Sequence, residues 1–66
     1  MALKNLKREM AAADVTVEAI ADTIKVHRNT AANKIDGVTK ITFDEAVAIR
    51  DKFFPGIGLE YLYQNE

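Results

Sequence analysis

The chain has 66 residues and a formal net charge of −1, with no Cys, no Ser and a single His. One small domain of this length buries only about 60% of its unfolded surface, which leaves little room for an enclosed active-site cavity. The missing Cys and Ser exclude disulfides, thiolate metal sites and the usual nucleophile arrangements. We therefore expect no enzyme, no cofactor and no small-molecule substrate.

The N-terminal segment predicts an amphipathic helix over residues 2–13, because Leu3, Leu6 and Met10 recur at i, i+3 and i+7. Three basic residues lie off this apolar stripe: Lys4, Lys7 and Arg8. They either form a solvated helix face or bring one cation to the edge of a bound duplex. The segment is too charged for a signal peptide, and no apolar run approaches the roughly 18 residues that span a bilayer. We expect an intracellular chain that does not bind membranes.

Residues 16–37, TVEAIADTIKVHRNTAANKIDG, predict two short helices with a tight break between them. The first helix carries its apolar residues on one stripe at i, i+3, i+4 and i+7: Val17, Ile20, Ala21 and Ile24. Thr16 suits its N-cap, because the hydroxyl can accept an amide hydrogen bond. In the break, Lys25 is expected in a left-handed backbone, at a cost of about 1 kcal/mol. His27 is a cap, a phosphate contact or simply exposed, and it has no evident partners for a metal site.

The second helix of the pair is expected over residues 27–35, with Ala31 and Ile35 one turn apart on its apolar face. Asn29 and Asn33 lie on the opposite face. Arg28 lies at the N-terminal tip, and Ala32 occupies the remaining outer position. One flank carries Thr30 and Lys34. The stop signal is Asp36 followed by Gly37. A helix that is apolar on one side and rich in hydrogen-bonding groups on the other has the form of a recognition helix.

Thr42 and Glu45 form a capping box for a further helix, which Pro55 ends. Apolar residues cover more than half of that helix, which predicts a position in the middle of the fold: Phe43, Ala46, Val47, Ile49, Phe53 and Phe54. Residues 59–63 make one or two last turns, with Leu59, Leu62 and Tyr63 on one side, which seal the core or form a subunit interface. Residues 1–66 are thus expected to form one all-α domain, a compact four- to five-helix bundle whose second and third helices form a helix-turn-helix.

Charge is distributed unevenly along the chain. Residues 1–24 carry a net charge of −1, residues 25–40 carry +3 and residues 41–66 carry −3. The overall acidity argues mildly against nucleic acid, since DNA-binding domains are usually basic. The local positive charge, however, falls on the predicted recognition helix and the loop after it, so one face can attract phosphates.

The segment 16–37 resembles the helix-turn-helix of the phage repressor and Cro family, in its five-helix lambda-repressor-like form. The family pattern T-x-x-x-L-A-x-x-L-G-V-S-R-x-T-V-S-x-x-I-x-G runs without gaps, and nine positions match: Thr16, Ile20, Ala21, Ile24, Val26, Arg28, Thr30, Ile35 and Gly37. The following TFDEAVAIRDKFFPGIGLEYLY is similar to the tail of small phage and prophage regulators, so the resemblance covers nearly the whole chain.

The resemblance implies that the second helix of the motif enters the major groove of DNA. The implied base-reading residues are Arg28 on guanine, Asn29 and Asn33 on adenine, and Ala32 against a thymine methyl. The implied backbone contacts are Thr16, Val17, His27, Thr30, Lys34, Thr39 and Lys40. Among the departures from the family, Val17 replaces a common Gln, Lys25 replaces the turn glycine and His27 replaces a Ser. These departures concern the clamping of the DNA backbone and not the fold.

The function implied by the resemblance is a sequence-specific transcriptional regulator, a phage or prophage repressor or Cro-like protein in the cytoplasm of a bacterial host. It would bind double-stranded operator DNA as a homodimer and block transcription, because one recognition helix reads only a few base pairs. The chain is either a complete Cro-like protein or the DNA-binding half of a longer repressor. The alternative is a helix-turn-helix module that binds other proteins, as in antitoxins or antirepressors.

Overall fold

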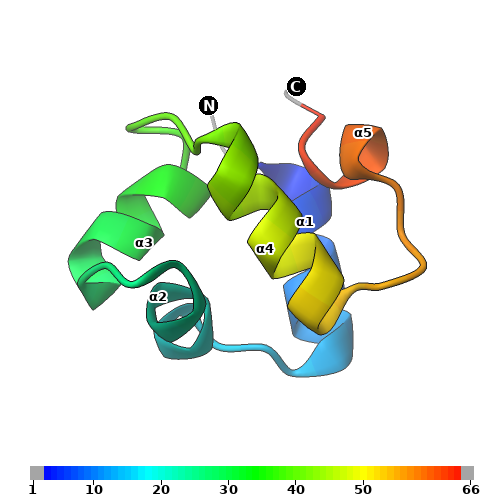
Figure 1. Cartoon of the computed structure of the whole chain (residues 1–66), viewed down its shortest axis with the longest axis horizontal. Coiled ribbons are helices and arrows are strands. Elements are labelled where there is room, and N and C mark those ends of the chain that lie inside the picture. The colour runs from blue at the N-terminus through cyan, green and yellow to red at the C-terminus, as the bar shows by residue number, and fades with distance from the viewer. Residues whose placement is uncertain (1–2, 65–66) are drawn as a thin grey trace.

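A computed structural model describes residues 3–64, which form five α-helices and no β-strand (Figure 1). The helices are α1 (Lys4–Ala13), α2 (Val17–Ile24), α3 (Arg28–Ile35), α4 (Phe43–Phe53) and α5 (Leu59–Leu62). In Figure 1, α4 crosses the centre of the molecule, with α2 and α3 on one side and α5 on the other. The predicted all-α bundle and the pairing of its second and third helices are confirmed. The first helix begins at Lys4, and residue 2 of its predicted range lies outside the described residues.

Side-chain caps start two of the helices where the sequence predicts them. The Thr16 hydroxyl accepts a hydrogen bond from the Ala19 amide at 3.1 Å and begins α2. At the start of α4, the Thr42 hydroxyl accepts from the Glu45 amide at 3.1 Å, and the Glu45 carboxylate accepts from the Thr42 amide at 3.0 Å. This reciprocal pair is the predicted capping box. Local sequence therefore fixes the direction in which α2 and α4 leave their turns.

Left-handed residues end the helices that precede the two tightest connections. Lys25, at φ 60° and ψ 48°, closes α2, which confirms the predicted conformation. Asp14 adopts nearly the same geometry after α1, at φ 58° and ψ 41°. Both are non-glycine residues in a region that disfavours a Cβ atom, so each connection stores about 1 kcal/mol of backbone strain.

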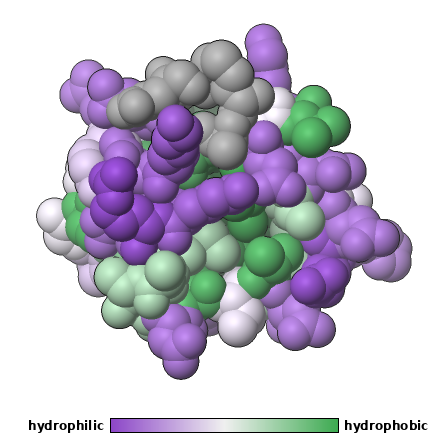
Figure 2. Space-filling view, turned by 180° about the vertical axis from the view of Figure 1, so that it is seen from behind, coloured by the Kyte–Doolittle hydropathy of each residue, from purple (hydrophilic) through white to green (hydrophobic). Residues whose placement is uncertain are grey.

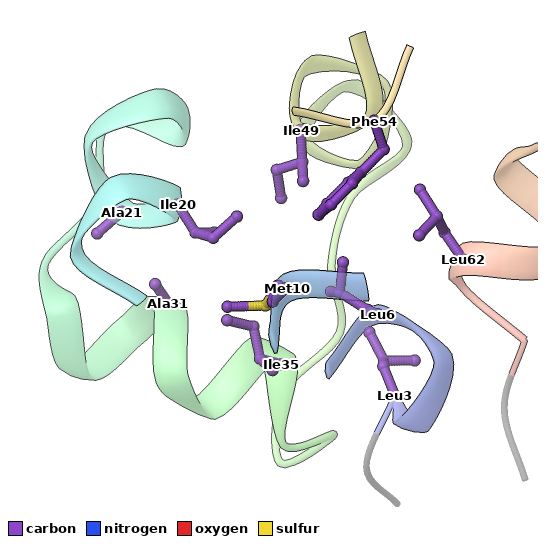
Figure 3. Packing of buried hydrophobic residues seen from close by; sticks show 10 residues of the cluster. All are labelled: Leu3, Leu6, Met10, Ile20, Ala21, Ala31, Ile35, Ile49, Phe54 and Leu62. Carbon is purple, nitrogen blue, oxygen red and sulfur yellow. The ribbon is translucent and has the colours of Figure 1, made fainter. Parts of the chain in front are cut away.

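Every helix contributes to one apolar core (Figure 3). Its buried members are Leu3, Leu6, Met10, Ile20, Ala21, Ala31, Ile35, Ile49, Phe54 and Leu62. The hydroxyl of Tyr63 closes one side by donating to the Ala46 carbonyl at 3.0 Å. Burial raises the pKa of Tyr63 to about 12, although the positive charge of Arg50 opposes this shift. The last turns therefore seal the core, which was one of the two expected roles.

Phe43 departs from the pattern of α4. The sequence places it with the core-facing residues, yet 74% of its surface is exposed. It is the first residue of α4, where a groove separates that end of the helix from α5. Helical periodicity assigns a residue to a side of the helix but cannot show that a neighbour is too far away to cover it.

Polar side chains join α1 to α5. Asn5 is 6% exposed, and its Nδ2 donates to the Tyr61 carbonyl at 2.9 Å. Its Oδ1 accepts from Arg8 Nη1 at 2.9 Å, and the Tyr61 hydroxyl donates to Glu9 Oε2 at 2.9 Å. We refer to these four residues as the α1–α5 seam.

None of the helices within residues 3–64 is long and apolar enough to cross a bilayer.

Candidate nucleic-acid interface

The two faces of α3 differ sharply in burial. Ala31 is 0% exposed and Ile35 is 3% exposed, so this face lies in the core against α2. Four polar or charged residues on the outer side are exposed: Arg28, Asn29, Thr30 and Asn33. Ala32 lies between them and is partly exposed, so the outer surface stays shallow at its centre. A protruding polar helix with a small central residue can enter a groove in a ligand.

The outer side chains of α3 are not used within the molecule. Among residues 3–64, the Arg28, Asn29 and Asn33 side chains make no hydrogen bond or ion pair. Amide and guanidinium groups left in this state are available to an external partner. The Asn33 carbonyl, in contrast, accepts from the amides of Val38 and Thr39 at 2.9 and 3.3 Å. The main chain of Asn33 thus anchors the following loop while its side chain remains exposed.

Lys34 has a structural role that the sequence did not indicate. Its Nζ lies 3.0 Å from Glu45 Oε1 and donates to the Lys40 carbonyl at 3.1 Å. The Lys34 and Glu45 side chains are only 14% and 19% exposed. Burial alone would raise the pKa of Glu45, but hydrogen bonds from Thr42 and Lys34 outweigh it and lower that pKa. Lys34 therefore connects α3, the loop and α4.

The loop after α3 presents Thr39 and Lys40 to solvent. Gly37 begins it at φ 81°, a backbone conformation that favours glycine. Val38 is also exposed, at 71%. Because Lys34 and Asn33 both make hydrogen bonds to the loop backbone, the main chain that carries the Lys40 side chain is held in place.

The N-terminus of α2 offers two backbone amides. Within the described residues, Thr16 satisfies the amides of Ala19 and Ile20 with its hydroxyl and its carbonyl. This leaves the amides of Val17 and Glu18 at an exposed helix end that favours anions. The Glu18 carboxylate in the same turn opposes a phosphate there. Val17 itself is partly buried against the core, so only its main chain is suited to this contact.

His27 occupies the N-cap position of α3, as predicted, but its side chain makes no capping hydrogen bond. It is exposed at the end of α3 next to Arg28. In residues 3–64 there is no group of three or more His, Asp or Glu side chains placed to hold a metal ion.

Ion pairs change the charge that α3 and its loop present. Asp36, the acid in residues 25–40, pairs with Lys7 at 2.6 Å, and Lys34 pairs with Glu45. Of the cations in residues 25–40, Lys25, Arg28 and Lys40 then have no ion pair within the described residues. Figure 2 shows the molecule from behind, where hydrophilic side chains divide the hydrophobic surface into separate areas. On α1, Lys7 pairs with Asp36 and Arg8 donates to Asn5, so both cations have partners within the molecule.

The arrangement can therefore bind an extended polyanion, with hydrogen-bonding groups on α3 between cations. The sequence predicted Arg28, Asn29, Asn33 and Lys40 as site residues and Lys25 only as a turn residue. It did not indicate that Glu45 pairs with Lys34, because that contact depends on the packing of α4. In comparisons with known proteins, the chain matches no protein-family model, no curated protein and no solved structure.

Proposed function

We propose that the chain is a sequence-specific DNA-binding transcriptional regulator that inserts α3 into the major groove. The observation that carries the proposal is the outer face of α3, where Arg28, Asn29 and Asn33 are exposed and unpaired within residues 3–64. The resemblance to phage repressor and Cro proteins supports the same function. On this basis the protein acts in the cytoplasm of a bacterial host, at the nucleoid.

Base reading is assigned to the residues on the outer face of α3. Arg28 is suited to guanine, because its guanidinium can donate to O6 and N7 together. Asn29 and Asn33 are suited to adenine, whose N6 and N7 match the donor and acceptor of a side-chain amide. The Ala32 methyl lies between them and can contact a thymine methyl.

Backbone contacts are assigned to the residues around that face. Thr30, His27, Thr39 and Lys40 lie beside it or in the adjoining loop and are exposed. The amide end of α2 at Thr16 and Val17 is a further phosphate site. Lys34 was expected to bind phosphate directly, and its pairing with Glu45 supports a positioning role instead, in which it holds the loop that carries Lys40.

The proposed mechanism is steric. A chain bound at an operator that overlaps a promoter would exclude RNA polymerase without any chemical step. One helix contacts only a few base pairs, so useful specificity needs two copies whose recognition helices lie about 34 Å apart along the duplex. A homodimer on an operator with two half-sites meets this requirement.

The test begins with selection of binding sites from a random pool of duplexes. On the selected site, Arg28→Ala should cost roughly 1–3 kcal/mol and relax preference at one base pair. Lys40→Ala should weaken binding to all sequences about equally and reduce the salt slope by roughly one unit. Lys52→Ala is the matched control, because Lys52 is an exposed cation in the last turn of α4.

Two results would contradict the proposal. If Arg28→Ala leaves operator affinity unchanged, the reading face is misassigned. If the wild-type chain binds no duplex even at low salt, the alternative of a protein-interaction module is favoured, since counterion release should strengthen any DNA binding as salt falls.

A further inference from the structure

Lys34 is a cation beside the proposed DNA-binding face that already has an anionic partner. It lies one turn after Thr30 on α3, so the two side chains are neighbours on one flank of the helix. A hollow of about 300 Å³ borders Lys34, and Thr39 and Lys40 of the adjoining loop also line it. Lys34 therefore lies among three residues assigned to the DNA backbone.

The anionic partner is Glu45, in the first turn of α4. Its Oε1 lies 3.0 Å from Lys34 Nζ and also accepts a hydrogen bond from the Thr42 amide at 3.0 Å. The capping box thus fixes the carboxylate in the position from which it contacts Lys34. Figure 1 shows the end of α3 and the following loop beside the start of α4, the arrangement that brings the two side chains together.

We propose that Glu45 is an intramolecular competitor of DNA phosphate for Lys34, and that it thereby lowers the affinity of the chain for every duplex. The excluded ligand is a phosphodiester oxygen of the DNA backbone, so the inference rests on the proposed function. An ammonium group carries one positive charge. A phosphate at Lys34 would also meet the Glu45 carboxylate on the same Nζ, and repulsion between the two anions would offset the attraction of the cation.

The other ion pair of α3 and its loop has the opposite effect on the charge presented to DNA. Lys7 pairs with Asp36 and so masks an acid that would repel phosphate, whereas Glu45 masks a cation that would attract it. The side chains of Lys7 and Asp36 are 47% and 50% exposed, against 14% and 19% for Lys34 and Glu45. Water and salt screen the sheltered pair less, so a phosphate displaces Glu45 from Lys34 less readily.

The loop after α3 does not depend on this ion pair for its position. The Asn33 carbonyl accepts hydrogen bonds from two loop amides at 2.9 and 3.3 Å, and the Lys34 carbonyl accepts from the Gly37 amide at 3.2 Å. These main-chain bonds involve neither the Glu45 carboxylate nor the Lys34 ammonium group. Removal of the Glu45 charge should therefore free Lys34 for phosphate and leave the loop in place.

The experiment measures binding of full-length chains to a random-sequence duplex over a range of salt concentrations. Glu45→Gln removes the charge and keeps the start of α4, because Gln also serves in a capping box. Asp44→Asn is the matched control, since Asp44 is an exposed acid in the same turn with no ion pair within residues 3–64. Two further chains carry Lys34→Met, alone and with Glu45→Gln. Circular dichroism confirms that the variants are folded.

We expect Glu45→Gln to bind about 5- to 10-fold more tightly than wild type at about 0.1 M salt, and to steepen the salt slope by about 0.9, the change for one added phosphate contact. Asp44→Asn should stay within about twofold of wild type with the same slope, because salt screens a charge that contacts no phosphate. Glu45→Gln should give no gain when Lys34→Met is already present.

Three results would overturn the inference. Equal gains from Glu45→Gln and Asp44→Asn would assign the effect to net charge. Weaker binding by Glu45→Gln than by wild type would show that the carboxylate supports the bound loop and does not compete with phosphate. A gain from Glu45→Gln that persists with Lys34→Met would show that Lys34 is not the cation released.

A measurement without DNA separates this inference from the proposed function. Inorganic pyrophosphate presents similar phosphate oxygens, and the NMR signal of the Lys34 Cε methylene group reports its binding. Millimolar pyrophosphate should shift this signal in Glu45→Gln more than in wild type or Asp44→Asn. If that shift occurs while no chain binds any duplex, the competition stands and the proposed function fails. If wild type binds duplex but Glu45→Gln matches Asp44→Asn in both measurements, the inference fails and the proposed function stands.

Discussion

The α1–α5 seam and the outer face of α3 both carry Asn and Arg side chains, and the structure uses them in opposite ways. In the seam, Asn5 is buried and bonded on both sides of its amide, and Arg8 donates to it. On α3, Asn29 and Asn33 are exposed and make no side-chain hydrogen bond within residues 3–64. Identical chemical groups thus stabilise the fold in one region and remain available to a partner in the other.

This difference separates structural polar residues from candidate binding residues without reference to any relative. A buried amide must be bonded, because an unsatisfied one costs about 1–3 kcal/mol. An exposed amide has no such requirement, since water satisfies it. Substitutions in the seam should therefore lower stability, and substitutions on the outer face of α3 should change binding alone.

The largest expected effect concerns the two faces of α3. Ile35→Ala should lower the free energy of unfolding by roughly 2–5 kcal/mol, because it removes buried methyl and methylene groups and leaves a cavity. Asn33→Ala, two residues away on the outer face, should change it by at most about 0.5 kcal/mol. Urea unfolding followed by circular dichroism measures both. Similar losses in the two variants would show that the outer face is structural.

The second-largest expected effect on stability compares an Asn in the α1–α5 seam with an Asn on the outer face of α3. Asn5→Ala should cost roughly 1–3 kcal/mol of unfolding free energy, because the Tyr61 carbonyl loses its hydrogen-bond donor at a buried position. Asn29→Ala should have little effect on stability. The same urea titrations apply. Equal stability of the two variants would contradict the assignment of Asn5 to the fold and Asn29 to binding.

Removing the hydroxyl of Tyr63 should have a smaller effect on the free energy of unfolding. Tyr63→Phe removes the hydrogen bond to Ala46 and should cost about 1 kcal/mol near neutral pH. The pKa of Tyr63 is about 12 in the folded chain and about 10 when unfolded, so the unfolded state releases the proton first. Its contribution to stability is complete below pH 10 and is lost as pH rises toward 12.

Thermal unfolding between pH 9 and pH 12 tests this dependence. Tyr63→Phe should lose less stability than wild type over that range. Tyr61→Phe is the control for the alkaline dependence, because it removes a hydroxyl that is hydrogen-bonded at an exposed position and keeps Tyr63. It lowers the starting stability as a seam substitution but should retain the alkaline loss. An alkaline loss that is the same in wild type and Tyr63→Phe would assign the effect to other groups.

The smallest effect concerns the connection next to α3. Lys25→Gly should stabilise the fold by roughly 0.5–1 kcal/mol, because glycine adopts the left-handed backbone without strain. Lys25→Ala removes the same charge and keeps the strain, so it should give no gain. Asp14→Gly, in the same backbone conformation beside the seam, should gain a similar amount. Melting temperatures measured in moderate salt give the comparison, and a gain from Lys25→Ala would point to charge rather than backbone.

Features that depend on adjacent residues could be predicted from the sequence. Thr16 and Thr42 act as caps because the amides they bind lie three residues away. The left-handed Lys25 follows from the short connection between two helices. The inner and outer faces of α3 follow from helical periodicity, since the same spacing that buries Ala31 exposes Asn29.

Features that depend on distant residues could not be predicted. Asn5 resembles any polar residue on an amphipathic helix until its partner is known, and that partner lies 56 positions away. Lys34 is suited to a phosphate by charge and position alone, but the packing of α4 places Glu45 within 3.0 Å of it. Phe43 matches the apolar side of α4, and only the arrangement of α5 shows that this side is open at its end.

The contacts of α1 also have a consequence for dynamics. The Leu3 amide donates to the Ile35 carbonyl at 3.1 Å, and Asn5 binds Tyr61, so α1 is hydrogen-bonded to the end of α3 and to α5. Each of these two hydrogen bonds joins residues that lie far apart in the chain. The entropic cost of ordering the chain segment between them arises once, when the domain folds, so the segment opens as a whole. Detachment of α1 would release both neighbours together, so the slowest-exchanging amide protons in all three helices should share a single rate of deuterium uptake. Rigidity at the end of α3 would then last as long as the domain itself stays folded.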